Sequence, residues 1–139
     1  MRKKDLAEVL KIERKCFEEP YSREIFEQEL KIKAAQLWVI PYRQKIVGYI
    51  DFWLVASEME LVSIAVHPKF KRRGIGQYLM EEMFDYGCQH QASSIVLDVR
   101  KSNLKAQKLY GKFGFKKVGL RKKYYSDNQE DAIVMKRKL

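Results

Sequence analysis

Apolar side chains follow two different spacings along this chain, and each spacing predicts a different kind of element. In residues 5–17, DLAEVLKIERKCF, the apolar positions recur every three or four residues, which is typical of a helix with one buried face. We expect Asp5 to cap this helix, Pro20 to end the region, and Ser22 to cap a second helix over residues 23–32. The buried stripe of the first helix is predicted to contain Leu6, Val9, Leu10, Glu13, Cys16 and Phe17.

The middle of the chain changes to the composition of strands. Residues 37–41, LWVIP, and 45–55, KIVGYIDFWLV, are rich in β-branched and aromatic residues and flank the polar Arg43-Gln44-Lys45, which predicts a hairpin. Residues 59–67, MELVSIAVH, form a nearly continuous apolar run. Such a run is typical of a strand that is covered on both faces.

The second half of the chain alternates between the two patterns. A helix is expected from Gly74 to about Gln91, then a buried strand over residues 94–99, SIVLDV. A further helix follows, capped by Asn103 and stopped at Gly114. The last two strands are expected in residues 115–125, FKKVGLRKKYY, and 131–138, DAIVMKRK.

The predicted order ααβββαβαββ is that of an α/β (α+β) protein with a mixed, mostly antiparallel central sheet and helices on both faces. Only four residues precede Asp5, so a first strand before the helices would be truncated or missing. No repeat or Pro/Gly-rich linker interrupts the pattern. We therefore expect one domain over residues 1–139.

Composition and charge narrow the function. With 139 residues, 46% of them hydrophobic, the chain is long enough to bury a core. Its two cysteines, Cys16 and Cys88, have no metal-ligand spacing, and we expect them to be packing residues in a reducing compartment, the cytoplasm. Neither a signal peptide nor a membrane span is predicted. The net charge of +10 favours an anionic partner.

The densest positive charge lies where a helix begins. Residues 65–84, AVHPKFKRRGIGQYLMEEMF, place Lys71, Arg72 and Arg73 directly before Gly74-Ile75-Gly76. A helix N-terminus carries free N–H groups and partial positive charge, and glycines allow close approach to the backbone, so this pattern indicates an anion site. Three cations on a solvated turn are the alternative. The sequence has neither the third glycine of a dinucleotide-binding Rossmann turn nor the Gly-Lys-Ser/Thr of a nucleoside-triphosphate-binding loop. This leaves a diphosphate cofactor without metal.

Several separated motifs resemble one superfamily. IAVHPKFKRRGIGQYLM, then VLDVRKSNLKAQKLYGKFGFKKVGLRKKYY, then EDAIVM are similar to the GCN5-related N-acetyltransferase (GNAT) superfamily, and within it to the ribosomal-protein-alanine N-acetyltransferases of the RimI group. The resemblance implies that the anion is the pyrophosphate of acetyl-coenzyme A, with coenzyme A as product and no metal. The family's loop usually begins with Gln or Arg where this chain has Lys71. The implied cofactor contacts are Ile64, Ala65, Val66, Lys71, Arg72, Arg73, Gly74, Ile75, Gly76, Gln77, Asn103 and Tyr110.

The resemblance also implies a direct attack by an amine. The strand ending in SIAV separates from the strand SIVLDV in this family, and N–H groups freed there polarise the thioester carbonyl. The general base corresponds to Asp98, where the group usually has Glu, and Glu60 is a second candidate. Asp98 alternatively only orders backbone or pairs with Arg100. The general acid corresponds to Tyr110, whose alternative role is packing with Ala106 and Phe113.

The acceptor site is implied by aromatic residues. Tyr124 and Tyr125 correspond to a loop that grips a peptide N-terminus, and Phe17, Pro20 and Tyr21 to the opposite wall, with Tyr21 replacing the usual Trp. A slot of this kind favours an α-amine over a lysine. We expect acidic residues of the acceptor to meet the cationic surface. Alternatively, the tyrosines are a cluster at the edge of the sheet.

Three functions therefore follow from the sequence. The first is acetyl transfer to a protein N-terminus, with the alanine of a small-subunit ribosomal protein as acceptor. The second is an acetyltransferase of the same fold that acts on a small amine or a lysine. The third is a basic RNA- or ribosome-binding module without catalysis, but the cations are dispersed over nearly every element, so direct nucleic-acid binding is not expected.

Overall fold

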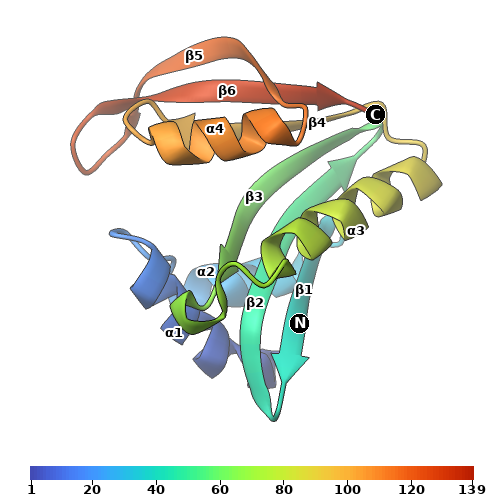
Figure 1. Ribbon diagram of the computed structural model, residues 1–139, viewed down its shortest axis with the longest axis vertical. Coiled ribbons are helices and arrows are strands. Elements are labelled where there is room, and N and C mark those ends of the chain that lie inside the picture. The colour runs from blue at the N-terminus through green and yellow to red at the C-terminus, as the bar shows by residue number, and fades with distance from the viewer.

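The computed structural model describes all residues from Met1 to Leu139, and its elements follow the predicted order (Figure 1). The helices are α1 (Leu6–Cys16), α2 (Arg23–Lys31), α3 (Ile75–Gln89) and α4 (Leu104–Lys112). The strands are β1 (Ala35–Tyr42), β2 (Lys45–Val55), β3 (Glu58–Val66), β4 (Ser94–Arg100), β5 (Lys116–Tyr125) and β6 (Glu130–Lys138). Two short 3₁₀ turns cover Lys3–Asp5 and Pro68–Phe70.

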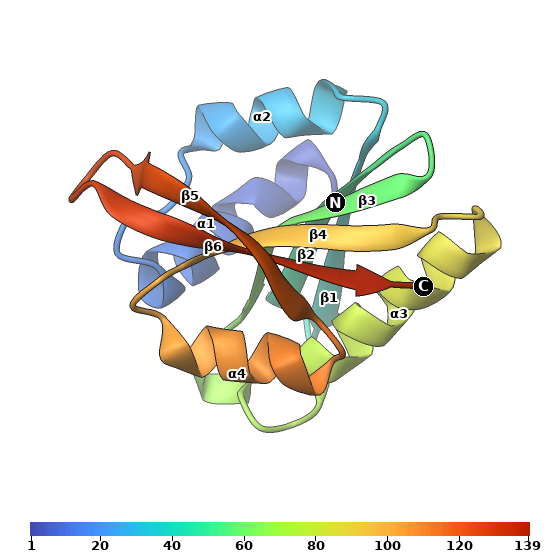
Figure 2. The same ribbon diagram turned by 90° about the horizontal axis from the view of Figure 1, so that it is seen from above.

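The six strands form one sheet in the order β1-β2-β3-β4-β6-β5. Every neighbouring pair is antiparallel except β3 and β4, which run parallel. Helices α1 and α2 lie on one face of the sheet, and α3 and α4 lie on the other (Figure 2). The predicted mixed sheet with helices on both faces is confirmed. No helix combines the length and the apolar composition that are needed to span a membrane.

Each face of the sheet has its own hydrophobic core, because successive residues of a strand point to opposite faces. In β2, Ile50 and Phe52 pack into the core beneath α3, together with Met83. Tyr49, the residue before Ile50, points to the other face and packs into the core beneath α1 and α2 together with Phe26. All five side chains are fully buried.

Two of the three predicted helix caps are confirmed. The Ser22 hydroxyl accepts a hydrogen bond from the Ile25 N–H at 3.3 Å, and the side-chain oxygen Oδ1 of Asn103 accepts one from the Ala106 N–H at 3.1 Å. The prediction for Asp5 was wrong. Its backbone is already helical, so its carboxylate cannot reach forward to α1 and instead accepts the Arg2 N–H at 2.8 Å.

The N-terminal residues form a 3₁₀ turn and no strand, as the short lead before α1 predicted. The terminal amine of Met1 donates a hydrogen bond to the Leu37 carbonyl at 2.6 Å, and β1 is the edge of the sheet. The predicted stripe of α1 is only partly buried. Leu10 is half-buried and Phe17 is exposed, whereas Ile12, which the predicted stripe did not include, is fully buried.

The strand predicted to be covered on both faces is covered on both only toward its end, where α1 contacts one face and α3 the other. In β3, Glu58 and Glu60 are exposed, and Val62, Ser63 and Ile64 are only half-buried. The reason is that α2 lies over β1 rather than over β3, and that β3 parts from β4 before its end. This partial exposure creates the candidate site.

Candidate active site

The sheet opens between its two parallel strands. The pairing of β3 with β4 runs from Glu58 opposite Ser94 to Leu61 opposite Leu97 and stops there, and beyond that point the two strands diverge (Figure 1). The His67 N–H donates to the Val47 carbonyl at 2.8 Å. Because alternate residues of an antiparallel pair face the same neighbour, the backbone groups of Ile64 and Val66 face the opening. The separation implied by the sequence motifs is therefore present.

The cationic loop between β3 and α3 has the geometry of an anion site. Arg72 and Gly74 both have left-handed backbone angles, φ 64° and 80°, which turn successive N–H groups toward one side. Helix α3 begins at the next residue, Ile75, and presents its free N–H groups there. No carboxylate forms an ion pair with Lys71, Arg72 or Arg73. These groups fit a phosphate-bearing ligand.

The loop adjoins the opening of the sheet. A Cβ atom placed on Gly76 would lie 3.7 Å from Val66 Cγ2, so the first turn of α3 packs against the end of β3. Of the other predicted cofactor contacts, Ala65 has its side chain buried in the α1/α2 core. The Gln77 side chain donates a hydrogen bond to Glu81 at 2.9 Å. Among the predicted cofactor contacts, the loop, the α3 N-terminus and the open β3 edge thus lie together. Asn103 caps α4 at the end of β4.

On the face of the sheet that carries α1 and α2, five of the predicted acceptor and catalytic residues line one cavity of about 190 Å³. They come from the loop before α2, from β3 and β4, and from the end of β5. Phe17 and Pro20 do not contribute and are exposed. We call this cavity the acceptor pocket, and its lining consists of Tyr21, Glu60, Leu61, Val62, Asp98, Tyr124 and Tyr125.

The β5 and β6 strands hold the tyrosine wall of the acceptor pocket. The rings of Tyr124 and Tyr125 pack edge to face at 5.1 Å, and Arg100 lies over Tyr125 at 3.9 Å. Arg100 is in turn held by Asp127 at 3.1 Å and Glu130 at 3.3 Å. Burial raises the pKa of Tyr125 to about 12, so its hydroxyl keeps its proton.

The two carboxylates of the acceptor pocket differ in their partners. Asp98 forms an ion pair with Arg121 of β5 at 3.1 Å, so the alternative pairing with Arg100 was wrong. Arg100 and Arg121 both lie opposite Ala132 of β6, in one row of the sheet, but Arg100 is engaged with the β5–β6 turn. Glu60 has no cationic partner within ion-pair distance. Loss of solvent, and then the charge of Asp98, raise its pKa.

A buried glutamate positions the opposite wall of the acceptor pocket. Glu13 is 1% exposed and accepts hydrogen bonds from the Tyr21 N–H at 3.1 Å and from the Tyr49 hydroxyl at 2.7 Å. The Tyr49 hydroxyl also lies 2.8 Å from Ser63 Oγ. Burial raises the pKa of Glu13. Sequence reasoning did not assign this role, although a glutamate on an apolar helical stripe was a visible signal.

A second buried carboxylic acid lies in β2 on the same face. Asp51 is completely buried, and neither of its carboxyl oxygens has a hydrogen-bond partner. Burial, and then the charges of Glu29, Glu13 and Glu60, raise its pKa to about 8. The expectation that acidic acceptor residues meet a cationic surface does not hold here, because the ionisable groups around the acceptor pocket are mainly acidic.

Replacing Asp51 with asparagine is expected to change how stability depends on pH. The folded chain keeps the Asp51 proton up to about pH 8, whereas the unfolded chain loses it near pH 4. The free energy of unfolding therefore falls across this window because of Asp51. Relative to wild type, the free energy of unfolding of Asp51→Asn should increase by about 3 kcal/mol between pH 5 and pH 7, measured by urea unfolding. The exposed Asp85→Asn is the control, and parallel pH curves for wild type and Asp51→Asn would contradict the prediction.

Tyr110 lies away from the acceptor pocket. It is on α4, on the other face of the sheet, and packs edge to face with Phe115 at 5.9 Å. Ala106 and Phe113 pack against the same core, so the packing role predicted for Tyr110 is present. Burial raises the pKa of Tyr110, and the phenol remains protonated.

The comparisons with known proteins decide the family. Residues 6–115 match the profile of the Acetyltransferase (GNAT) family. The chain belongs to the GNAT family. It is 35% identical over 136 residues to a putative ribosomal protein bS18-alanine N-acetyltransferase of Bacillus subtilis, covering 97% of this chain and 90% of the relative. The resemblance found in the motifs is confirmed.

Solved GNAT structures share the fold. The crystal structure of the ribosomal-protein-S18-alanine N-acetyltransferase from Escherichia coli superposes with a TM-score of 0.89 at 28% identity, over 99% of this chain and 90% of that one. A GNAT acetyltransferase from Elizabethkingia anophelis, solved with acetyl-CoA bound, superposes with a TM-score of 0.74 at 25% identity, over 85% of this chain and 84% of that one. This GNAT chain is an N-acetyltransferase, and acetyl-CoA is the donor that GNAT acetyltransferases use.

Proposed function

We propose that this GNAT enzyme acetylates the N-terminal α-amine of a protein, and that its acceptor is the N-terminal alanine of a small-subunit ribosomal protein. The relative from Bacillus subtilis is named as a putative alanine N-acetyltransferase of ribosomal protein bS18, and the Escherichia coli enzyme of known structure as the alanine N-acetyltransferase of ribosomal protein S18. The observation that carries the proposal is the acceptor pocket. It opens at the point where β3 and β4 part, and it combines three tyrosines with two carboxylates.

We assign acetyl-CoA to the opposite side of the opening. The N–H groups of residues 71–76 and of the first turn of α3 would hold its pyrophosphate, with Lys71, Arg72 and Arg73 as unpaired cations. The backbone N–H groups of Ile64 and Val66 would face its pantetheine arm and thioester carbonyl. When bound, acetyl-CoA supplies an acetyl group activated as a thioester.

The residues of the acceptor pocket suit an amine that arrives as an ammonium. An α-amine has a pKa near 8, so only modest help is needed to remove its proton. We assign this step to Glu60, because its carboxylate faces the pocket without a cationic partner and its pKa is raised. Asp98, held by Arg121, raises the pKa of Glu60 through its charge. On the other face, Tyr110 Oη holds a proton for the leaving sulfur.

The tyrosines of the acceptor pocket favour a chain terminus over a lysine side chain. Tyr21 is fixed through its own N–H by the buried Glu13, and Tyr125 by Arg100, so both walls are rigid.

We infer one domain over residues 1–139, since one sheet joins all strands. We assign the enzyme to the cytoplasm, where the free thiols of Cys16 and Cys88 stay reduced.

A peptide panel tests the proposal. With labelled acetyl-CoA, a peptide with a free N-terminal alanine should be labelled, whereas the same peptide blocked at its N-terminus and carrying an internal lysine should not. Coenzyme A alone should raise the melting temperature by several degrees at saturating concentration. Equal labelling of both peptides would contradict the N-terminal assignment. The absence of any shift in melting temperature would contradict the assigned cofactor site.

A further inference from the structure

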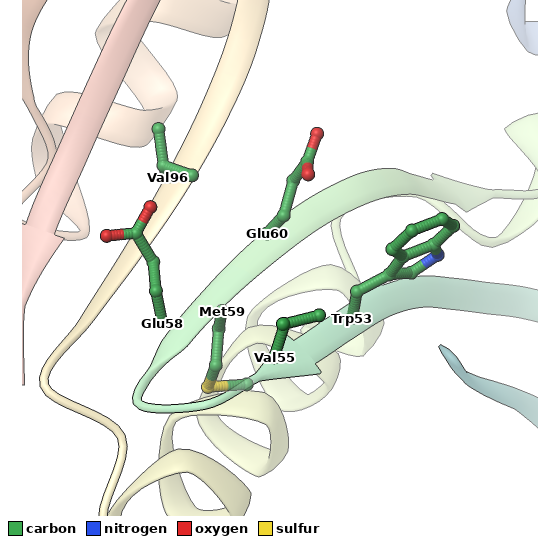
Figure 3. A pocket seen from close by; sticks show the side chains of 6 residues that line it. All are labelled: Trp53, Val55, Glu58, Met59, Glu60 and Val96. Atoms are coloured by element: carbon green, nitrogen blue, oxygen red, sulfur yellow. The ribbon is translucent and has the colours of Figure 1, made fainter. Parts of the chain in front are cut away.

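A second cavity continues the acceptor pocket along the same face of the sheet. It has a volume of about 250 Å³, and Glu60 lines both cavities. Figure 3 shows the carboxylates of Glu58 and Glu60 on the same side of β3, with Trp53 of β2 on one flank and Val96 of β4 on the other. We call this second cavity the side groove.

The strand register explains how the side groove is built. Trp53, Glu60 and Val96 are direct partners across β2, β3 and β4 and form one row. Val55 and Glu58 form the next row toward the strand ends. The side groove therefore offers an indole ring and aliphatic side chains next to two carboxylates, which suits a long side chain that ends in a cation.

Additional negative charge surrounds this row. The Trp53 indole N–H donates to Glu29 of α2 at 2.9 Å, which fixes the ring and brings a third carboxylate close. Asp51 precedes Trp53 by two residues in β2 and therefore lies on the same face, in the neighbouring row, opposite Ser63. It is fully buried with both oxygens unpartnered and keeps its proton at neutral pH, so the negative charge of this row comes from Glu29, Glu58 and Glu60.

The existing contacts leave most of this charge uncompensated. Glu58 accepts hydrogen bonds from Lys136 and from Ser94 Oγ, each at the long distance of 3.4 Å. The side chains of Lys136 and Glu58 are 39% and 52% exposed, so their ion pair is weak. Glu29 and Glu60 form no ion pair. In a chain of net charge +10, this is a local acidic surface.

We propose that the side groove is a specificity subsite for a basic side chain, arginine or lysine, at the second or third residue of the acceptor protein. The inference rests on the proposed function, which puts the acceptor amine beside Glu60. Glu58 is two residues along β3, about 7 Å away. An extended peptide advances by about 3.5 Å per residue, so its second or third side chain reaches Glu58 and the Trp53 ring.

The test measures acetylation of peptides that begin with alanine and carry one arginine at position 2, 3, 4 or 6, each compared with glutamine at the same position. Arginine at position 2 or 3 should lower KM about fivefold to tenfold at low salt, with kcat unchanged, and 0.5 M salt should reduce this preference. Arginine at position 6 should have no effect. The overall positive field of the enzyme repels cationic peptides, so a preference confined to positions 2 and 3 has a local origin.

Three variants assign the preference to the side groove. Glu58→Gln should reduce the arginine preference to twofold or less while the KM for the glutamine peptides stays unchanged. Lys136→Gln should increase the preference, because it removes the cation that competes for Glu58. The exposed Glu82→Gln on α3 is the matched control and should behave as wild type.

The outcomes separate the subsite from the proposed function. If the glutamine peptides are acetylated and arginine changes KM equally at every position or at none, the subsite is wrong and the proposed function stands. An unchanged preference in both Glu58→Gln and Lys136→Gln also overturns the subsite. If no alanine peptide is acetylated while coenzyme A still raises the melting temperature, the proposed acceptor is wrong and the subsite falls with it.

Discussion

Replacing Tyr110 with phenylalanine is expected to lower kcat by about 10², with little change in the affinity for coenzyme A. The phenol is half-buried, and its raised pKa keeps it protonated until a strong base forms beside it. A departing thiolate is such a base. Tyr110 makes its structural contacts through the ring, edge to face with Phe115, and phenylalanine preserves them.

Steady-state kinetics and a coenzyme A titration of the melting temperature would measure the two quantities separately. Tyr42→Phe is the control, because Tyr42 lies in the β1–β2 hairpin and is 45% exposed. A variant Tyr110→Phe with wild-type kcat would leave Tyr110 as a packing residue only. A large loss of coenzyme A binding would instead make it a cofactor contact.

Glu60→Gln is expected to lower kcat/KM at pH 7 by about 10² and to abolish the acidic limb of its pH profile. Glu60 faces the acceptor pocket without a cationic partner, and its raised pKa brings it closer to that of the amine it deprotonates. Below its pKa the carboxyl is protonated and inactive. The acidic limb in wild type thus reports the ionisation of Glu60.

Asp98→Asn separates the two carboxylates. Asp98 raises the pKa of Glu60 by its charge, so this variant should keep the acidic limb but shift it to lower pH, with a loss of kcat/KM of about tenfold or less. Arg121, released from its ion pair with Asp98, would act in the same direction, because its charge lowers the pKa of Glu60. The reverse pattern, in which only Asp98→Asn abolishes the limb, would make Asp98 the base.

The order of elements could be predicted from the sequence because it depends on local rules. Apolar spacing and the caps Ser22 and Asn103 depend on residues within one or two turns. The left-handed backbone at Gly74, next to three cations and a helix start, was likewise a local feature. Asp5 failed as a cap because the turn before α1 had already taken its carboxylate, a detail of backbone geometry.

The catalytic constellation was predictable only as separate motifs. The sequence nominated Tyr21, Glu60, Asp98, Tyr124 and Tyr125 from motif similarity, and the fold brings these five around one cavity. It did not predict the supporting residues. Two signals were visible, Glu13 on an apolar helical stripe and Asp51 inside an apolar strand, but their partners are distant in the chain.

By itself, the sequence determined the class of fold, the position of the cationic loop before α3 and the family, because short-range spacing carries each of them. The tertiary structure alone decided which cation pairs with Asp98, that β3 is open on one side, and that the acceptor face is acidic in a chain of net charge +10. Pairing across strands and the burial of charge depend on register and on the distances between elements. Those are set only when the whole sheet has formed.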